Sequence, residues 1–122
     1  MARIVILGGG FGGATLAQRL GRRARRLGLE VSLVDRHNYF VFTPLLVEAG
    51  TGALEPRHAV VPLRDFVRGA AVRTAEVVGL DAAARRVTIR GTGKDEDESL
   101  GYDHLVVALG SVTKLPPVPG LA

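Results

Sequence analysis

The chain has 122 residues, of which 47% are apolar and 23% charged, and its formal net charge is +4. This length allows one domain with a substantial core, and the composition is typical of a soluble globular protein. The absence of cysteine excludes a disulfide framework, a thiolate metal site and a redox-active dithiol within these residues.

No apolar run approaches the roughly 20 residues of a membrane-spanning helix. The first apolar run leads directly into glycines and lacks the pattern of a signal peptide. We therefore expect a cytoplasmic protein, or one that is peripheral at the cytoplasmic face of a membrane.

A short apolar run at positions 4–7 predicts a strand that is buried on both faces, as in a parallel sheet. Glycines follow at once, and Gly8, Gly10 and Gly13 fit the dinucleotide fingerprint. In this motif the first glycine permits a tight turn, the second lets the backbone approach a pyrophosphate, and the third lets helix and strand pack closely. The phosphates would face the N–H groups at the start of the next helix.

This turn has two alternative interpretations besides the fingerprint. The phosphate loop of nucleoside triphosphatases needs Lys-Ser or Lys-Thr after its last glycine, whereas Ala14 and Thr15 follow Gly13. The sequence therefore argues against a triphosphatase. A glycine-rich turn without a ligand stays as the alternative, because the chain holds 16 glycines and chance matches occur.

A helix is predicted directly after the glycines. Its apolar positions recur at spacings of three and four and predict one buried stripe: Ala17, Leu20, Ala24 and Leu27. Gly28 is placed to cap its end, while Gly21 interrupts it at a cost of about 1 kcal/mol relative to alanine. Residues 29–34 then predict a second strand, which completes a βαβ unit.

Asp35 ends this second strand, 22 residues after Gly13. An acidic residue roughly 20 residues beyond the glycines accepts a hydrogen bond from a ribose hydroxyl in dinucleotide-binding units. A carboxylate also disfavours a 2′-phosphate. The βαβ unit therefore indicates FAD or NAD without distinguishing them. The alternative is that Asp35 is an ordinary surface aspartate at the end of a strand.

Four arginines gather near the end of the predicted helix: Arg22, Arg23, Arg25 and Arg26. We interpret them as a solvated helix end, where cations complement the helix dipole. An anionic membrane surface is the alternative partner. Nucleic acid does not fit, because no aromatic residue is interleaved with these arginines.

Residues 36–46 are too apolar for an ordinary surface loop, and three of the six aromatic residues fall within four positions there. We expect this segment to pack against a ligand or another part of the protein. His37 is interpreted as structural or solvent-facing, because no nucleophile or acid is placed to partner it. His58 and His104 are unpaired in the same way, so no metal site is predicted.

The remaining segments predict a small antiparallel meander and a returning strand. We expect a short helix and a loop over 46–57, a helical turn over 61–67 with Pro62 at its start, and strands over 71–80 and 86–90. The acidic stretch 91–98 lacks the spacing of a calcium loop and predicts a hairpin tip. Residues 105–110 predict a buried strand beside the first one.

These elements predict an α/β, Rossmann-like FAD/NAD(P)-binding fold that is only partial. A parallel sheet would carry one βαβ dinucleotide unit, next to the antiparallel meander. We assign residues 1–115 to this domain. The proline-rich stretch 116–122 would be an exit linker toward a further domain.

The glycine fingerprint, Asp35, the Phe-Thr-Pro-Leu-Leu stretch at 42–46 and the strand that leads from Tyr102 to Gly110 together resemble a known family. The chain is similar to FAD-dependent pyridine nucleotide oxidoreductases over nearly its whole length. The resemblance is greatest to the N-terminal part of type II, non-proton-pumping NADH dehydrogenases. These enzymes pass electrons from NADH through FAD to a quinone.

The resemblance implies FAD as the cofactor at this site. The glycine turn would hold the pyrophosphate, the carboxylate the adenosine ribose, and the last strand would approach the cofactor again. The implied cofactor-binding residues are Gly8, Gly9, Gly10, Phe11, Gly12, Gly13, Asp35, Arg36 (near the adenine), Thr43, Pro44, Leu45 (toward the flavin), Val77 (a backbone contact to adenine), Ala108, Leu109 and Gly110.

The chain departs from the family pattern in two places. Ala108-Leu109-Gly110 stands where the family has Ala-Thr-Gly, so the hydroxyl of that threonine is lost. No Cys-x4-Cys motif follows the second strand, which excludes a dithiol relay and leaves transfer from nicotinamide to flavin to an external acceptor. No catalytic residue is predicted within the chain.

The second glycine fingerprint, which would bind NADH as co-substrate, and the membrane-docking region of the family have no counterpart in these 122 residues. We expect an N-terminal piece of a longer oxidoreductase, inactive alone, that needs the missing NADH-binding region or a partner chain and a quinone-type acceptor. Its apolar last strand would make the isolated piece self-associate. The alternative is a non-catalytic module that binds NAD or FAD or serves in assembly.

Overall fold

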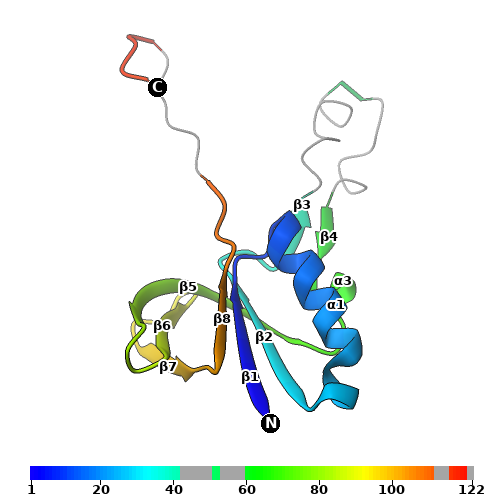
Figure 1. Ribbon diagram of the computed structural model, residues 1–122. Coiled ribbons are helices and arrows are strands. Elements are labelled where there is room, and N and C mark those ends of the chain that lie inside the picture. Colours follow the sequence, from blue (N-terminus) through cyan, green and yellow to red (C-terminus); the bar gives the residue numbers. More distant parts are fainter. Residues whose placement is uncertain (42–50, 53–59, 112–115, 121–122) are drawn as a thin grey trace.

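The computed structural model describes residues 1–41, 51–52, 60–111 and 116–120. The elements in chain order are β1 (Ala2–Leu7), α1 (Phe11–Leu27), β2 (Leu29–Asp35), β3 (Tyr39–Val41), β4 (Val60–Pro62), α3 (Leu63–Phe66), β5 (Ala71–Asp81), β6 (Arg86–Gly91), β7 (Asp97–Gly101) and β8 (His104–Val107). Six strands form one mixed sheet in the order β7-β6-β5-β2-β1-β8, and β3 and β4 form a separate pair (Figure 1).

The centre of the large sheet is parallel. β1 pairs in parallel with β2 on one side and with β8 on the other, so that Ile4 lies opposite both Val31 and His104. β2 in turn pairs in parallel with the first part of β5. The predicted βαβ unit and the return of the last strand beside the first are both confirmed.

The long strand β5 joins this parallel part to the antiparallel meander. Its first four residues pair with β2, and its later residues pair antiparallel with β6, which pairs with β7. The register shifts between Val77 and Gly79, and such a bulge sharpens the twist of a strand. The predicted α/β fold with a small meander is therefore confirmed.

The helix α1 packs against the sheet through small residues. Its buried positions are Gly13, Ala14, Ala17, Gly21 and Ala24. Gly28 ends the helix in the left-handed conformation, with φ of 65°, and its N–H donates to the carbonyl oxygen of Ala24, as predicted. The expected buried position of Leu27 is wrong, because this side chain is 55% exposed where the helix leaves the sheet.

The core has two parts, because successive side chains of a strand point to opposite faces of the sheet. Ile6, Val31 and Leu33 pack beneath α1, while Val5 and Val34 pack with residues of the meander on the other face. All five side chains are almost fully buried. Since both faces are covered, β1 has a continuous apolar run over residues 4–7.

The segment around Pro62 differs from its prediction. Residues 60–62 form β4, which pairs antiparallel with β3 so that Pro62 lies opposite Tyr39. The helical turn starts only at Leu63, and its N–H donates to the carbonyl oxygen of Asn38. Pairing with a distant aromatic segment decides this boundary, and local sequence does not show such pairing. The helix expected over 46–57 falls outside the described residues, except for the turn at 51–52.

Two strand ends also differ from the predictions. β7 begins at Asp97, so the last two acidic residues of the expected hairpin tip belong to a strand. There Asp97 accepts a hydrogen bond from Arg90, and Glu98 accepts one from Arg73. β8 ends at Val107, so residues 108–110 leave the sheet instead of extending it. Within the described ranges, no helix is long and apolar enough to cross a membrane.

Candidate dinucleotide site

The carboxyl ends of the parallel strands meet at one edge of the sheet. The chain leaves β1 toward β2 on one side, and β8 returns on the other side, which makes the end of β1 a topological switch point. Open α/β sheets bind ligands in the crevice at such a point. A cavity of about 470 Å³ lies there.

Residues from the ends of β1, β2 and β8 and from the middle of β5 line this cavity. Seven of them are predicted cofactor-binding residues: Gly8, Gly10, Asp35, Arg36, Val77, Leu109 and Gly110. Four others were not predicted: Val34, His37, Ala75 and Glu76. The structure therefore brings together residues that are up to 102 positions apart in the sequence, from Gly8 to Gly110.

Two glycines of the turn are required by the packing of the protein itself. Gly8 has φ of 105°, and a Cβ atom there would lie 2.1 Å from the carbonyl oxygen of Ala108. A Cβ atom on Gly13 would lie 1.7 Å from the carbonyl oxygen of Gly8. Hydrogen bonds fix the turn, since the Gly8 N–H donates to Val34 and the Ala108 N–H donates to Leu7.

Two other glycines of the turn face open space. A Cβ atom on Gly10 or Gly12 would meet nothing within 4 Å among the described atoms. Gly10 is the N-cap of α1 without a side-chain cap, and the first turn of this fully described helix has no acidic residue. The start of a helix attracts anions through its N–H groups and its dipole. The turn therefore fits a pyrophosphate that approaches the backbone.

The carboxylate of Asp35 binds the backbone of the glycine turn. Its Oδ2 accepts a hydrogen bond of 2.5 Å from the Gly9 N–H, and its Oδ1 accepts one of 2.9 Å from the His37 N–H. A Cβ atom on Gly9 would lie 2.7 Å from Oδ2, so only glycine allows this contact. An ionised carboxylate offers about four acceptor positions, so it can also accept a hydroxyl hydrogen bond.

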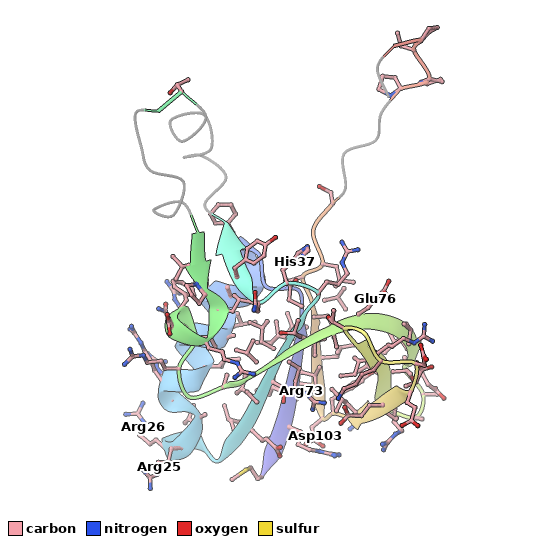
Figure 2. The ribbon with its side chains drawn as sticks, turned by 180° about the vertical axis from the view of Figure 1, so that it is seen from behind. Arg25, Arg26, His37, Arg73, Glu76 and Asp103 are labelled. Atoms are coloured by element: carbon pink, nitrogen blue, oxygen red, sulfur yellow. The ribbon has the colours of Figure 1, made fainter. Side chains whose placement is uncertain are left out.

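Two polar residues also line the cavity although the sequence did not predict them there, His37 and Glu76. The His37 ring stacks on Tyr39, with centroids 5.2 Å apart. In the view of Figure 2, His37 and Glu76 both lie above Arg73 and Asp103. His37 could have been found from its place two residues after Asp35. Glu76 could not, because only strand pairing sets Thr74 beside Asp35.

Five further predicted residues are described by the structure but do not line the cavity. Gly9, Phe11, Gly12 and Gly13 belong to the turn and the first turn of α1, and Ala108 packs against Gly8. Thr43, Pro44 and Leu45 lie outside the described residues.

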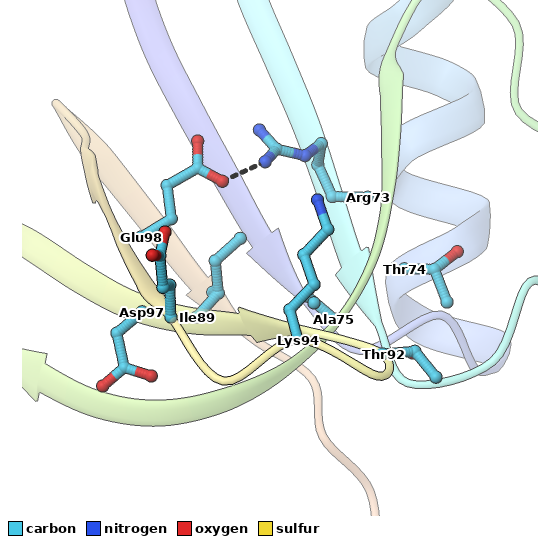
Figure 3. Close-up of a pocket in the computed structure, with 10 residues that line it drawn as sticks. Arg73, Thr74, Ala75, Ile89, Thr92, Lys94, Asp97 and Glu98 are labelled. Carbon is cyan, nitrogen blue, oxygen red and sulfur yellow. Dashed lines mark hydrogen bonds and ion pairs between the residues drawn. The ribbon is translucent and has the colours of Figure 1, made fainter.

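A second cavity, of about 560 Å³, lies in the meander and shares only Ala75 with the first (Figure 3). Two of its carboxylates are paired: Glu98 with Arg73, which also lines the cavity, and Asp97 with Arg90, which does not. The hydrogen bond to Asp97 raises the pKa of the Arg90 guanidinium. Because its described lining holds three carboxylates and only two cations, Arg73 and Lys94, this cavity offers no comparable anion site. Among the described residues, no group of three or more potential ligands could hold a metal ion.

Comparisons with known proteins agree with this geometry. The demethylphylloquinone reductase NdbB of Synechocystis is 39% identical over 123 residues, which cover 98% of this chain and 30% of that protein. The mitochondrial external NADH-ubiquinone oxidoreductase 2 of Saccharomyces cerevisiae is 32% identical over 97% of this chain and 22% of its own length. The chain thus spans less than a third of these curated relatives.

A solved structure, NDH2 from Plasmodium falciparum in complex with NADH, matches 93% of this chain and 23% of its own. The TM-score is 0.78 at 25% sequence identity. The predicted resemblance to NADH:quinone oxidoreductases is confirmed by these relatives. Finally, residues 2–122 match the model of a protein family that is described as pyridine nucleotide-disulphide oxidoreductase. Because this match covers nearly the whole chain, the protein belongs to the pyridine nucleotide-disulphide oxidoreductase family.

Proposed function

We propose that this chain is the FAD-binding portion of a flavin-dependent oxidoreductase that transfers electrons from NADH to a quinone-type acceptor. The observation that carries the proposal is the convergence of Gly10, Asp35 and Gly110 on one cavity at the switch point of the sheet. The names of the relatives add support, since they are reductases of ubiquinone and demethylphylloquinone.

Each part of the site has a role in this proposal. The open backbone at Gly10 and the start of α1 hold the pyrophosphate. Asp35, held in place by two backbone N–H groups, accepts a hydroxyl of the adenosine ribose. Arg36 and the backbone at Val77 flank the adenine, and residues 108–110 lead toward the flavin together with Thr43, Pro44 and Leu45.

Bound FAD would supply the two-electron chemistry. The chain itself contributes binding, orientation and the electrostatic surroundings of the cofactor. The proposal assigns NADH binding to a separate region or a partner chain, with residues 1–115 as the FAD domain and 116–122 as the connection. It also places the protein in the cytoplasm, peripheral at the cytoplasmic face of a membrane.

Self-association of the 122-residue chain is a further part of the proposal. Among the described strands, β8 pairs only with β1, so its outer edge carries unpaired backbone groups. Val107 is 62% exposed on this edge. Apolar edge strands pair readily with other chains.

Titration of the full chain with FAD, and separately with NAD, tests the proposed function by calorimetry. We expect FAD to bind more tightly. Asp35→Ala should weaken FAD binding at least about tenfold, since hydrogen bonds to a charged group contribute about 1.5–3 kcal/mol.

Asp81→Ala is the matched control, because the Asp81 carboxylate also accepts a backbone N–H, from Ala84 at 3.1 Å, and lies away from the cavity. Thermal unfolding of both variants separates lost binding from lost folding. A preference for NAD would favour the non-catalytic dinucleotide module instead. Failure to bind either nucleotide would contradict both functions.

A further inference from the structure

The solvent-facing side of α1 carries five exposed arginines, which we name the arginine stripe: Arg19, Arg22, Arg23, Arg25 and Arg26. The first, second, third and fifth of these stand at spacings of three, four and seven, which places them on one face of a helix. This face is opposite the buried glycines and alanines. Arg25 and Arg26 extend outward at the end of the helix (Figure 2).

The arginines of the stripe have no ion pair or side-chain hydrogen bond within the described part of the chain, unlike several arginines of the sheet. Arg73 and Arg90 pair with carboxylates, Arg86 donates to Ser99, and Arg3 lies beside Asp103. The helix itself contributes five positive charges and no negative one, which exceeds the net charge of +4 of the whole chain. The excess positive charge is therefore concentrated on one helix face.

This arrangement opposes helix stability. Like charges three or four residues apart repel one another, and the stripe contains several such pairs, for example Arg19 with Arg22 and Arg23. The helix dipole favours cations only in the last turn, which holds Arg25 and Arg26. The interpretation as a solvated helix end thus leaves the three earlier arginines unexplained. A row of like charges that destabilises its helix, with no compensating interaction within the chain, is typical of a functional surface.

We propose that the arginine stripe docks the protein onto an anionic lipid surface. A guanidinium group forms paired hydrogen bonds with phosphate, and a straight row of exposed cations matches a planar array of phosphates. The inference rests on the proposed function, because a hydrophobic quinone acceptor dissolves in a bilayer. The apolar side of α1 is occupied by the core, so the binding is electrostatic and should weaken as salt is added.

The stripe and the cofactor site can be occupied at the same time. The cavity lies at the beginning of α1, whereas the stripe begins at Arg19 and continues to the helix end. None of the five arginines lines the cavity. Lipid binding and nucleotide binding are therefore separable by mutation.

Co-sedimentation with vesicles tests this proposal. The full chain is mixed with vesicles of phosphatidylcholine alone, or with phosphatidylglycerol making up a third of the lipid. The test variant combines Arg19→Gln, Arg22→Gln and Arg23→Gln, because glutamine keeps the helix propensity of arginine. We expect binding to the anionic vesicles only, and an about hundredfold lower partition coefficient for the variant.

The control variant combines Arg86→Gln, Arg90→Gln and Lys94→Gln, which removes the same charge from the meander. It should bind anionic vesicles as the unmodified chain does. Equal losses in both variants would overturn the proposal, because net charge alone would then account for binding. Binding to duplex DNA at a salt concentration where anionic vesicles do not bind would also overturn it.

Two readouts keep this proposal distinct from the proposed function. The test variant should keep its affinity for FAD, and it should unfold at a higher temperature because the repulsion between like charges is relieved. If FAD fails to bind while the vesicles do, the proposed function fails and the docking surface stands. The reverse outcome rejects the docking surface alone.

Discussion

At the scale of single residues, the glycine turn divides into two kinds of position. Gly8 and Gly13 are demanded by contacts within the protein, since a Cβ atom at either would overlap a backbone carbonyl. Gly10 and Gly12 are free of such contacts. The fingerprint predicts this division, because its first and third glycines serve the turn and helix packing while its second faces a ligand, and the contacts of Gly8, Gly10 and Gly13 agree with it.

This difference predicts opposite behaviour for two single substitutions. Gly8→Ala should lower the free energy of unfolding by about 2–4 kcal/mol, because φ of 105° strains an L-residue and the added methyl group overlaps Ala108. Gly10→Ala should change stability by less than about 1 kcal/mol and yet weaken FAD binding, because its methyl group enters the space left for the pyrophosphate. Urea unfolding and FAD titration measure the two effects. Unchanged FAD affinity in folded Gly10→Ala would contradict the pyrophosphate assignment.

At the scale of elements, α1 is held by a close crossing with the segment before β5. A Cβ atom on Gly21 would lie 2.2 Å from the carbonyl oxygen of Arg68, and one on Gly69 would lie 2.2 Å from that of Gly21. Helix propensity alone predicts that Gly21 is a modest defect in the helix. The structure shows that this glycine permits the close contact of two backbones.

Two substitutions within α1 should therefore have opposite signs. Gly21→Ala is expected to destabilise by about 2 kcal/mol, because overpacking outweighs the gain in helix propensity. Gly12→Ala should stabilise by about 0.5–1 kcal/mol, since its methyl group is unopposed. Thermal unfolding of both variants measures the difference. A stabilised Gly21→Ala protein would show that the crossing relaxes without cost.

The start of β8 is attached to β1 by a reciprocal pair of hydrogen bonds. The Arg3 N–H donates to Oδ2 of Asp103 at 2.6 Å, and the Asp103 N–H donates to the carbonyl oxygen of Arg3 at 2.8 Å. The first of these bonds lowers the pKa of the Asp103 carboxyl below its usual value, with help from the nearby Arg3 charge. The ionised carboxylate is therefore the form that favours the folded state.

The lowered pKa of Asp103 determines how its contribution to the free energy of unfolding depends on pH. A lowered pKa in the folded state stabilises the protein above the unfolded pKa of about 4, and the contribution is lost as the pH falls through the folded value. We expect Asp103→Asn to be less stable than the unmodified chain at neutral pH, with a difference that closes in acid. Urea unfolding over a pH series measures it. A difference that stays constant with pH would rule out the carboxylate as its source.

At the scale of the whole molecule, the two edges of the large sheet differ. One edge strand resists pairing with other chains, and the other is open to it. The meander ends the sheet with the short, charged strand β7, whereas the other end is β8 with its exposed apolar residues. Charged edges resist pairing with other chains and apolar edges promote it. The two edges of one sheet therefore differ in their tendency to associate.

Self-association should accordingly depend on β8. Sedimentation velocity at micromolar concentrations should show oligomers of the unmodified chain, and Val107→Lys should shift them toward the monomer. Leu27→Lys is the control, because it adds the same charge at a side chain of similar exposure on a helix. A monomeric unmodified chain would contradict the expected association.

The local parts of this protein could be predicted from short stretches of the sequence. The apolar run, the glycines, the helix stop at Gly28 and the acid at Asp35 follow from side-chain size, backbone freedom and charge within short stretches. The family resemblance added the strand that returns to Gly110. These features were enough to predict the fold class and seven residues of the cavity.

The contacts between these parts depend on the tertiary fold and could not be predicted from the sequence. Pairing of β3 with β4 moved the helical turn, the register of β5 beside β2 brought Glu76 to the cavity, and a backbone crossing explained Gly21. The tertiary fold also leaves the arginine stripe on α1 without a counter-charge among the described residues. Such contacts join segments that are distant in the chain, and local propensity and spacing carry no information about them.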